Sequence, residues 1–268
     1  MSGRPRATLH YAAAKPTARE ASWADSFVNT AWYSLARELS ERYIGRGTHC
    51  RTDEPVSFDM KYKPHSPACE RNREPILAVL QRHFADRSRV LEIGSGTGQH
   101  AVYFGAALPH LTWQTSDLES YHAGIRAWLD EAALANVLPP LTLDVTGDWP
   151  ETQFDAVFSA NTLHIMGWRE VEAFFAALPT VLPVDGKLII YGPFHYDGRP
   201  TSDSNARFDA TLRSQPGDMG IRDRSAVDRL ARAAGLRLID DIAMPANNRC
   251  LLWQKTAASI TWPGKDGA

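Results

Sequence analysis

The sequence predicts an α/β fold, in which a mostly parallel sheet is covered by helices on both faces. Short apolar segments alternate with amphipathic ones from Ser66 onward, as the strand and helix units of a parallel sheet do. A glycine-rich turn over residues 94–98 follows the first apolar segment and precedes a helical pattern. Near the end of the chain, only the stretch 243–248 joins two apolar segments, which predicts a hairpin and an antiparallel last strand.

Each expected element follows from its local pattern, because apolar residues recur every three to four positions in a helix and form short runs in a buried strand. The first strand, at 89–93, is followed by the glycine turn and a helix through Ala106. The long polar stretch 197–220 predicts a loop that covers a substrate. The remaining expected elements are helices at 70–82, 121–135, 170–178 and 225–234, and strands at 112–116, 140–143, 154–160, 187–191, 236–242 and 249–254.

The first part of the chain predicts a separate helical extension. Apolar residues recur every four positions from Trp23 to Tyr43, and Gly45 marks the end of this amphipathic helix. Its aromatic stripe packs on the main domain, or else it forms a lid or a dimer surface. We therefore expect a tail and helix over residues 1–60, a main domain over 61–256 and a short tail over 257–268.

Composition narrows the class of partner. The 268 residues carry 29 Lys and Arg against 31 Asp and Glu, a net charge of −2, which gives no broad positive field for nucleic acid. The three cysteines have no metal-ligand spacing, so the sequence predicts no metal site and a reducing, cytoplasmic location. No apolar run is long enough for a membrane span, so no membrane partner is expected. A small-molecule partner remains, with a homodimer as an option for the amino-terminal helix.

The turn GSGTG at residues 94–98 predicts a nucleotide site, because glycines let the backbone approach a ligand beside the positive end of a helix. The dinucleotide fingerprint needs glycine at position 99, where this chain has Gln99, which disfavours a nicotinamide cofactor. The phosphate-loop motif is absent as well. Glu92, two residues before the first glycine, instead suits a ligand with an amino group at that end.

Acidic residues close the next two expected strands. Asp117 follows the second strand and suits bidentate acceptance from ribose hydroxyls, and Asp144 follows the third and suits the amino group of an adenine. Any one of these carboxylates alone is more often a helix cap or a turn residue. Together with Glu92, however, they form one ordered set at three neighbouring strand ends, which favours a nucleoside ligand.

These residues resemble the class I S-adenosylmethionine-dependent methyltransferases over most of residues 66–255, and more narrowly the methyltransferase-like protein 26 family, a domain of unknown function. The resemblance implies a Rossmann-like, seven-stranded sheet with a reversed last strand, and S-adenosyl-L-methionine as cofactor. It does not extend to the first 60 or so residues. The matching stretches are SPACERN (66–72), VLEIGSGTGQHA (90–101), FSANTLHI (158–165), YGPF (191–194), TSDSN (201–205), FD (208–209), GIRD (220–223) and NN (247–248).

Two groups of site residues are expected at the carboxyl ends of the strands, where ligands of open parallel sheets lie. The cofactor group comprises Glu92, Gly94, Ser95, Gly96, Thr97, Gly98, Asp117, Leu118, Asp144, Val145 and Asn161. The catalytic group comprises His164 as general base, His195 as a second base and Tyr191, and the substrate group comprises Asn72, Trp168, Phe194, Asn205 and Arg222. Each side chain in the last two groups also has a structural interpretation as a core, cap or ion-pair residue.

The sequence as a whole predicts a methyltransferase that acts on oxygen or nitrogen of a small aromatic or heterocyclic molecule. Two alternatives stay open at this point. One is a protein that binds S-adenosylmethionine without methyl transfer, and the other is a nicotinamide-dependent oxidoreductase. Titration with the two cofactors separates the oxidoreductase from the rest, and detection of S-adenosylhomocysteine separates binding from turnover.

Overall fold

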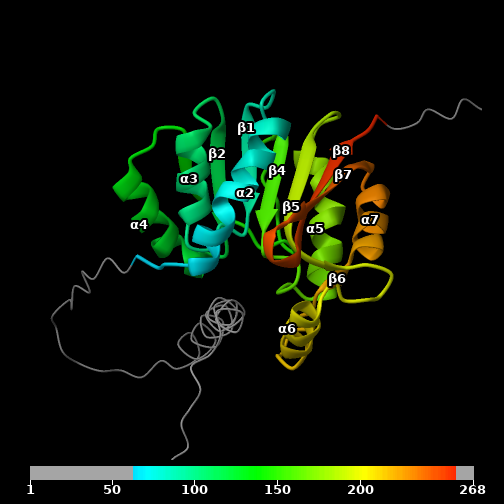
Figure 1. Cartoon of the computed structure of the whole chain (residues 1–268). Helices are drawn as coiled ribbons and strands as arrows, with labels where there is room; N and C mark the ends of the chain where they lie inside the picture. The colour runs from blue at the N-terminus through cyan, green and yellow to red at the C-terminus, as the bar shows by residue number, and fades with distance from the viewer. Residues whose placement is uncertain (1–62, 258–268) are drawn as a thin grey trace, which may run out of the picture.

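The computed structural model of the chain describes residues 63–257. The expected tail and helix over residues 1–60 lie outside these residues, and so does the expected tail over 257–268 apart from Ala257. Within them the fold is a mixed sheet with helices on both faces (Figure 1). No helix in this range is long and apolar enough to cross a membrane.

The sheet confirms the predicted topology. Its main path has the order β3-β2-β1-β4-β5-β8-β7, and a further two-residue strand, β6, pairs with β5. Strands β1 to β5 pair in parallel, whereas β8 runs antiparallel to both of its neighbours. The strands are β1 (Arg89–Ile93), β2 (Thr112–Asp117), β3 (Val137–Thr142), β4 (Ala156–Ala160), β5 (Lys187–His195), β6 (Arg222–Asp223), β7 (Leu236–Met244) and β8 (Asn248–Lys255).

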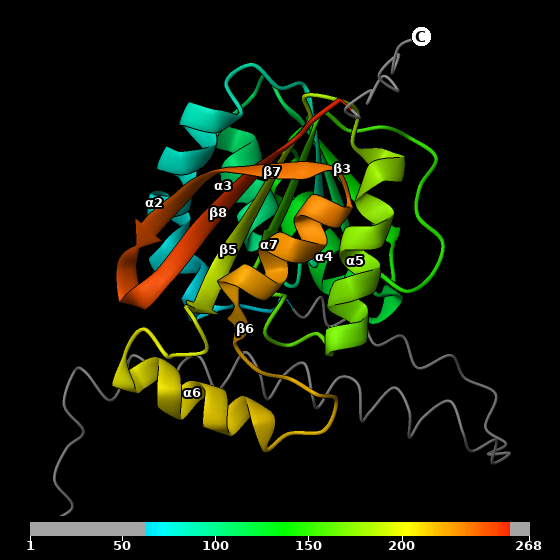
Figure 2. The same ribbon diagram turned by 90° about the vertical axis from the view of Figure 1, so that its right-hand side faces the viewer.

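The helices form two layers and one outlying element. Helices α2, α3 and α4 cover one face of the sheet, α5 and α7 cover the other, and α6 lies beyond the end of β5 (Figures 1 and 2). We call the edge at which β1, β2, β4 and β5 end the carboxyl edge. The helices are α2 (Pro67–His83), α3 (Gln99–Ala107), α4 (His122–Ala132), α5 (Trp168–Val181), α6 (Asp203–Arg213) and α7 (Arg224–Ala233).

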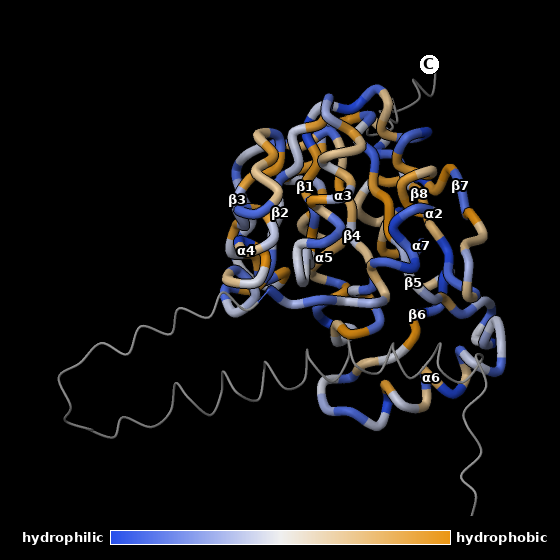
Figure 3. Tube along the Cα trace, turned by 60° about the vertical axis from the view of Figure 1, so that its left-hand side comes forward, coloured by the Kyte–Doolittle hydropathy of each residue, from blue (hydrophilic) through white to orange (hydrophobic). Residues whose placement is uncertain are grey.

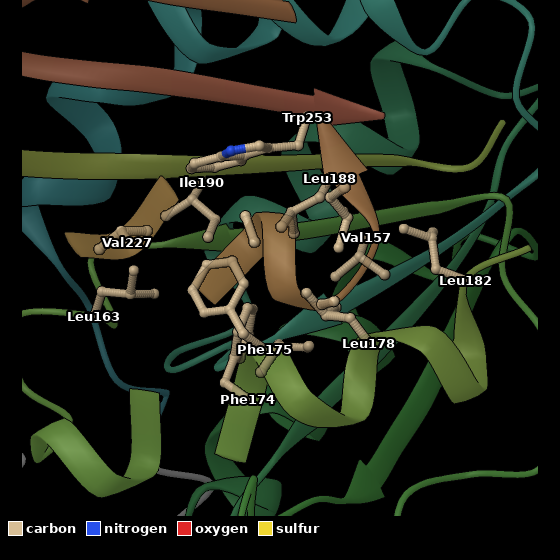
Figure 4. Close-up of a cluster of buried hydrophobic side chains, with 14 of the residues drawn as sticks. Val157, Leu163, Phe174, Phe175, Leu178, Leu182, Leu188, Ile190, Val227 and Trp253 are labelled. Atoms are coloured by element: carbon tan, nitrogen blue, oxygen red, sulfur yellow. The ribbon is translucent and has the colours of Figure 1, made fainter. Parts of the chain in front are cut away.

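Two apolar clusters hold the layers together, one on each face of the sheet. Hydropathy along the chain shows the hydrophobic stretches concentrated in the interior (Figure 3). In the cluster beneath α5 and α7, Phe175 and Leu178 pack against Ile190 and Trp253 of the sheet (Figure 4). The opposite cluster, beneath α2 and α3, is centred on the buried Trp113 and its aromatic neighbours.

The region 197–220 and strand β3 differ in particular from the sequence prediction. The stretch 197–220 is not a plain loop, because it contains α6, whose amide of Asn205 is capped by the Ser202 hydroxyl. Leu212 of α6 packs against Met219 and Ile221, contacts that the polar local composition does not reveal. Strand β3 begins at Val137 rather than at 140, and it accommodates two prolines because it lies at the edge of the sheet.

Candidate functional site at the carboxyl edge

The glycine turn lies between β1 and α3 at the carboxyl edge. Gly94, Gly96 and Gly98 all have positive φ angles, of 74°, 59° and 88° respectively, which L side chains adopt only with strain. A Cβ on Gly94 would lie 2.5 Å from Cγ2 of Thr162, in the segment that follows β4. Glycine at position 94 therefore lets the turn approach its neighbour, and it gives the backbone amides their orientation.

Glu92 lies beneath this turn, where it braces the loop. Its Oε2 accepts hydrogen bonds from Oγ of Ser95 at 2.9 Å and from Nε1 of Trp113 at 3.1 Å. Burial raises the pKa of Glu92 to about 7, against the lowering effect of these two donors. The sequence prediction placed Glu92 in direct contact with a ligand amino group. The structure shows hydrogen bonds of Glu92 to Ser95 and Trp113, and the sequence does not indicate the second of these partners.

Asp117 joins the glycine turn to the end of β2. Its two carboxylate oxygens accept hydrogen bonds from the amides of Gly96, at 2.7 Å, and Leu118, at 2.8 Å. Burial raises the pKa of Asp117 to about 6, although both amides stabilise the charged form. The side chain is thus a carboxylate held in a fixed orientation beside the loop.

The remaining predicted cofactor positions differ in their surroundings. Leu118 is 45% exposed, an unusual position for a leucine, directly beside Asp117. Asp144 is exposed in the turn after β3, where its Oδ1 accepts hydrogen bonds from the amide and the hydroxyl of Thr146. Val145 is buried. Leu118 therefore presents an apolar surface at the edge, whereas Asp144 stabilises its own turn.

The segment after β4 turns sharply at Asn161, which has a positive φ of 61°. Its amide donates to the carbonyl of Tyr191, while Thr162 and Ser159 share a buried hydroxyl hydrogen bond of 2.7 Å. His164 follows, buried, with its ring 5.4 Å from that of Phe208 on α6. Burial and the neighbouring charge of Arg222 lower the pKa of His164 to about 4, so the ring is neutral at physiological pH.

Arg222 holds the segment that carries His164. Its Nε donates to the carbonyl of Leu163 at 3.1 Å, and its Nη2 donates to the carbonyls of Met166 and Asp218. The guanidinium also lies 5.8 Å from the centre of the Trp168 ring. Arg222 of β6 and Trp168 at the start of α5, two of the predicted substrate residues, thus lie side by side. The contacts of Arg222 are structural ones, with backbone carbonyls.

Three predicted site residues, Tyr191, Phe194 and His195, lie in β5 and have different surroundings. Phe194 is only 1% exposed and is part of the core, so its ring does not line the carboxyl edge as the sequence prediction expects. The reason is the strand alternation, which puts Phe194 on the same face as Ile190. Tyr191 is buried too, and burial raises its pKa to about 12 against the lowering effect of the neighbouring Asn72 and Asn248 side chains. His195 is buried, and its Nε2 has no hydrogen-bond partner among the described residues.

A buried polar network connects α2 to the glycine turn, and the sequence prediction missed it. Oδ1 of Asn72 lies 2.7 Å from Nε2 of His100, whose Nδ1 lies 3.9 Å from the sulfur of Cys69. Oε1 of Gln99 accepts from the hydroxyl of Thr97 and from the amide of Ser66. Position 99 therefore carries a side chain because it anchors α2. The stretches SPACERN and GSGTGQH, which the sequence shows only as separate motifs, meet here.

Asn205 connects α6 to the hairpin between β7 and β8. Its Nδ2 donates to the hydroxyl of Thr201 at 2.8 Å and to the carbonyl of Asn247 at 3.2 Å. Asp209, also on α6, accepts from the amide of Ile221. Helix α6 is thus held at both ends, and its Phe208, in contact with His164, is a further candidate that the sequence prediction did not include among the site residues. No cluster of metal-ligating side chains occurs in residues 63–257.

Comparison with solved structures shows the Rossmann-like fold of class I methyltransferases. Similar structures include an O-methyltransferase family protein from Burkholderia thailandensis (19% identity, TM-score 0.62, 69% of this chain and 56% of that one). They also include the S-adenosylmethionine-dependent methyltransferase SibL (19%, 0.63, 85% and 70%). A third is human N-acetylserotonin methyltransferase in complex with SAM (14%, 0.56, 71% and 58%).

The chain spans just over half the length of the Burkholderia protein and of the human enzyme. A family model described as "Protein of unknown function (DUF938)" matches residues 63–255. The chain belongs to this family.

Proposed function

We propose that the chain is an S-adenosylmethionine-dependent methyltransferase acting on oxygen or nitrogen of a small aromatic or heterocyclic acceptor. One observation carries the proposal: the Asp117 carboxylate, bonded to the Gly96 amide, lies beside the exposed side chain of Leu118. A carboxylate fits two vicinal ribose hydroxyls, and an exposed leucine fits the face of an adenine. The similar structures named above, all methyltransferases by title, support the same reading.

The residues that would hold the cofactor are those predicted from the sequence. The amides of the glycine turn, Asp117 and Leu118 would hold the nucleoside, with Glu92 supporting the turn from below. Asp144, Val145 and Asn161 stand at the neighbouring strand ends and complete the set. When bound, the cofactor supplies a methyl group already activated by its sulfonium. The protein's own task is then to orient the acceptor and exclude water.

The acceptor would lie between the segment after β4 and helix α6. His164 and Phe208 provide its polar and aromatic contacts there, and Arg222 and Trp168 fix the backbone on which His164 stands. With a pKa near 4, His164 is a weak base, which favours positioning over proton removal. Asn72, Asn205 and Tyr191 support this side of the edge through their buried contacts. His195 stays the proposed second base, as a buried side chain at the end of β5.

The finer assignments rest on the sequence. The resemblance to the methyltransferase-like protein 26 family supports the same cofactor. We propose that residues 61–256 form the catalytic domain and that residues 1–60 act as a lid or a dimer element in a cytoplasmic protein. Deletion of residues 1–60 is expected to lower turnover more than cofactor affinity if they form a lid. Loss of solubility with unchanged activity per folded molecule would instead identify a packing or dimer element.

The test is turnover of the full-length chain with labelled S-adenosylmethionine and a panel of phenols, aromatic amines and heterocycles. We expect S-adenosylhomocysteine to form in proportion to one methylated small acceptor. Cofactor binding without product over the whole panel would favour a binding protein. Binding of NAD in preference to S-adenosylmethionine would favour an oxidoreductase, and methylation of a macromolecule alone would contradict the proposed substrate class.

A further inference from the structure

A buried positive charge stands beside His164. Arg222 is only 8% exposed, and within residues 63–257 every hydrogen bond of its guanidinium goes to a backbone carbonyl. Two of these carbonyls, of Leu163 and Met166, flank His164 in the chain. A buried charge without a hydrogen-bonded carboxylate costs free energy, so the field it creates is expected to have a use.

The carboxylates around Arg222 are already engaged by other groups. Asp209 accepts from Nε of Arg213 and from the amide of Ile221, Glu170 accepts from the amide of Gly167, and Asp218 accepts from that of Trp168. Burial is the largest cause of the lowered pKa of His164, and Arg222 is the neighbouring charge that lowers it further. Arg222 therefore adds a positive charge beside the His164 ring.

The ring of His164 is buried but keeps free hydrogen-bonding capacity, because it takes part in no hydrogen bond between described residues. Unlike Nε2 of His195, its nitrogens are not among the fully enclosed, unpartnered atoms of that part of the chain. Gly192 leaves space for a methyl-sized group beside it, since a Cβ there would be in ordinary van der Waals contact, 3.8 Å from Nδ1 of His164. A neutral imidazole has one N–H, which donates to an acceptor oxygen.

From this arrangement we infer that the methyl acceptor is an acidic hydroxyl compound of the phenol type, which binds beside His164 as its oxyanion. The inference rests on the proposed function and narrows its substrate class. Burial disfavours a charge of either sign, whereas the positive charge of Arg222 disfavours a proton on His164 and favours loss of a proton from a hydroxyl at the same place. The proton goes to the buffer on binding, and His164 donates its N–H to the resulting oxygen anion. An aromatic amine gains nothing from this field, because it is neutral before and after binding.

Phe208 supplies the aromatic part of this site. It is partly buried on α6, in edge-to-face contact with His164, and α6 is fixed by Asn205 and Asp209. A planar ring that places its oxygen at His164 therefore meets the ring of Phe208. Together, Arg222, His164 and Phe208 favour a flat, ionisable aromatic hydroxyl compound over an aliphatic alcohol.

The test uses 4-nitrophenol, whose phenolate is coloured, bound to the full-length chain saturated with S-adenosylhomocysteine. Absorbance is followed against pH for the free and the bound phenol, and 4-nitroaniline and 4-nitroanisole serve as neutral analogues of similar shape. We expect the bound phenol to titrate at least one pH unit lower than the free phenol, which means about tenfold tighter binding of the phenolate than of the phenol. Both neutral analogues are expected to bind at least tenfold more weakly.

Variants locate the source of this shift. Arg222→Met is expected to abolish it, and Arg207→Met, which removes an exposed arginine of α6, is expected to leave it unchanged. Because Arg222 also holds a backbone segment, His164→Phe provides a second variant, expected to weaken phenolate binding while retaining part of the shift. The titration of the unchanged protein decides the matter even if Arg222→Met does not fold.

The outcomes separate this inference from the proposed function. Failure of S-adenosylhomocysteine to bind would contradict the proposed function itself. If S-adenosylhomocysteine binds but the phenol titrates at or above its free value, binds no better than the amine, or does not bind at all, the oxyanion inference is overturned. The methyltransferase proposal would survive that result.

Discussion

The two sides of the carboxyl edge differ in how far apart in the chain their contacts lie. On the donor side, formed by β1, β2 and the glycine turn, Glu92 bonds Ser95 three residues away, and Asp117 bonds Gly96 across 21 residues. On the acceptor side, formed by the segments after β4 and β5 with α6, Arg222 bonds Leu163 across 59 residues. The donor side is one strand–turn–helix–strand unit, whereas the acceptor side is assembled from segments that only the fold brings together.

The donor side is therefore held by hydrogen bonds between residues close in the sequence, and the acceptor side by hydrogen bonds between distant segments. Loss of one local contact leaves the rest of the donor unit to hold the loop. Loss of one long-range contact frees a whole segment, because ordering it again costs loop-closure entropy. Substitutions on the two sides are therefore expected to have different effects on stability and binding.

The largest effect is expected for Gly94→Ala. The new Cβ would meet Thr162 at 2.5 Å with φ at +74°, so strain and overpacking add to about 2–5 kcal/mol of lost unfolding free energy. Gly198→Ala is the matched control, since its φ of +71° is nearly the same but no atom lies within 4 Å of the Cβ position. We expect about 1–2 kcal/mol there, from strain alone. Denaturant unfolding measures both, and equal losses would contradict the close approach at Gly94.

The next effect concerns cofactor affinity. Asp117→Ala is expected to weaken binding of S-adenosylhomocysteine by about 1.5–3 kcal/mol, the scale of charge-assisted hydrogen bonds. Asp144→Ala, in an exposed turn, is expected to cost less than about 1 kcal/mol. Calorimetric titration of folded variants gives both values. Unchanged affinity in Asp117→Ala would remove the ribose assignment, and a larger loss in Asp144→Ala would reverse the roles of the two strand ends.

The pKa of Asp117, raised to about 6, predicts opposite pH dependences for binding and stability. Binding needs the carboxylate, so cofactor affinity falls as pH drops below about 6. Stability behaves inversely: a carboxyl whose folded pKa is raised binds its proton more readily when folded. Its contribution is greatest below the unfolded value of 3.8 and is lost as pH rises towards 6.

Comparison with Asp117→Asn isolates this group from the others that titrate. Relative to the variant, the unchanged protein is expected to gain stability and lose cofactor affinity between pH 6 and pH 4. Titration calorimetry and unfolding at several pH values measure the two differences. Parallel trends in both would contradict the burial of an Asp117 carboxyl with a raised pKa.

The smallest effect is expected on the acceptor side, for His164→Ala. Loss of one hydrogen bond predicts about a tenfold lower rate, against about 10²-fold or more for loss of a general base. The sequence alone predicts an ionisation of a catalytic histidine between about pH 5 and 8. With the pKa of His164 near 4, that ionisation lies lower. A pH–rate limb near neutrality that disappears in His164→Ala would contradict this account.

Local patterns predicted the donor side well. Strand β1 was expected at its observed bounds, and Asp117 at the end of β2, because apolar runs and glycine turns are local signals. The same patterns predicted the reversed β8, since its short hairpin connection is also local. The sequence does not predict Trp113 as a partner of Glu92. The residue pattern of a buried strand does not indicate which side chain forms a hydrogen bond with the neighbouring strand.

The acceptor side was harder to predict for physical reasons. Helix α6 has mostly polar residues, and only its packing against Met219 and Ile221 reveals its apolar face. Phe194 looked like a pocket residue because β5 was expected to end at Tyr191, whereas the strand continues through His195 and turns Phe194 into the core. From the sequence, Gln99 is only a departure from the dinucleotide glycine motif. Its hydrogen bond with the amide of Ser66 cannot be predicted locally, because Ser66 precedes α2, on the other side of β1 in the chain.

The central claim is that the glycine turn and Asp117 bind the nucleoside of S-adenosylmethionine. Calorimetric titration of the full-length chain with S-adenosylhomocysteine, and separately with NAD, tests it most directly. The account predicts saturable binding of one S-adenosylhomocysteine per chain, weakened in Asp117→Ala, and no comparable binding of NAD. Binding of NAD in its place, or affinity for S-adenosylhomocysteine that does not depend on Asp117, would contradict it.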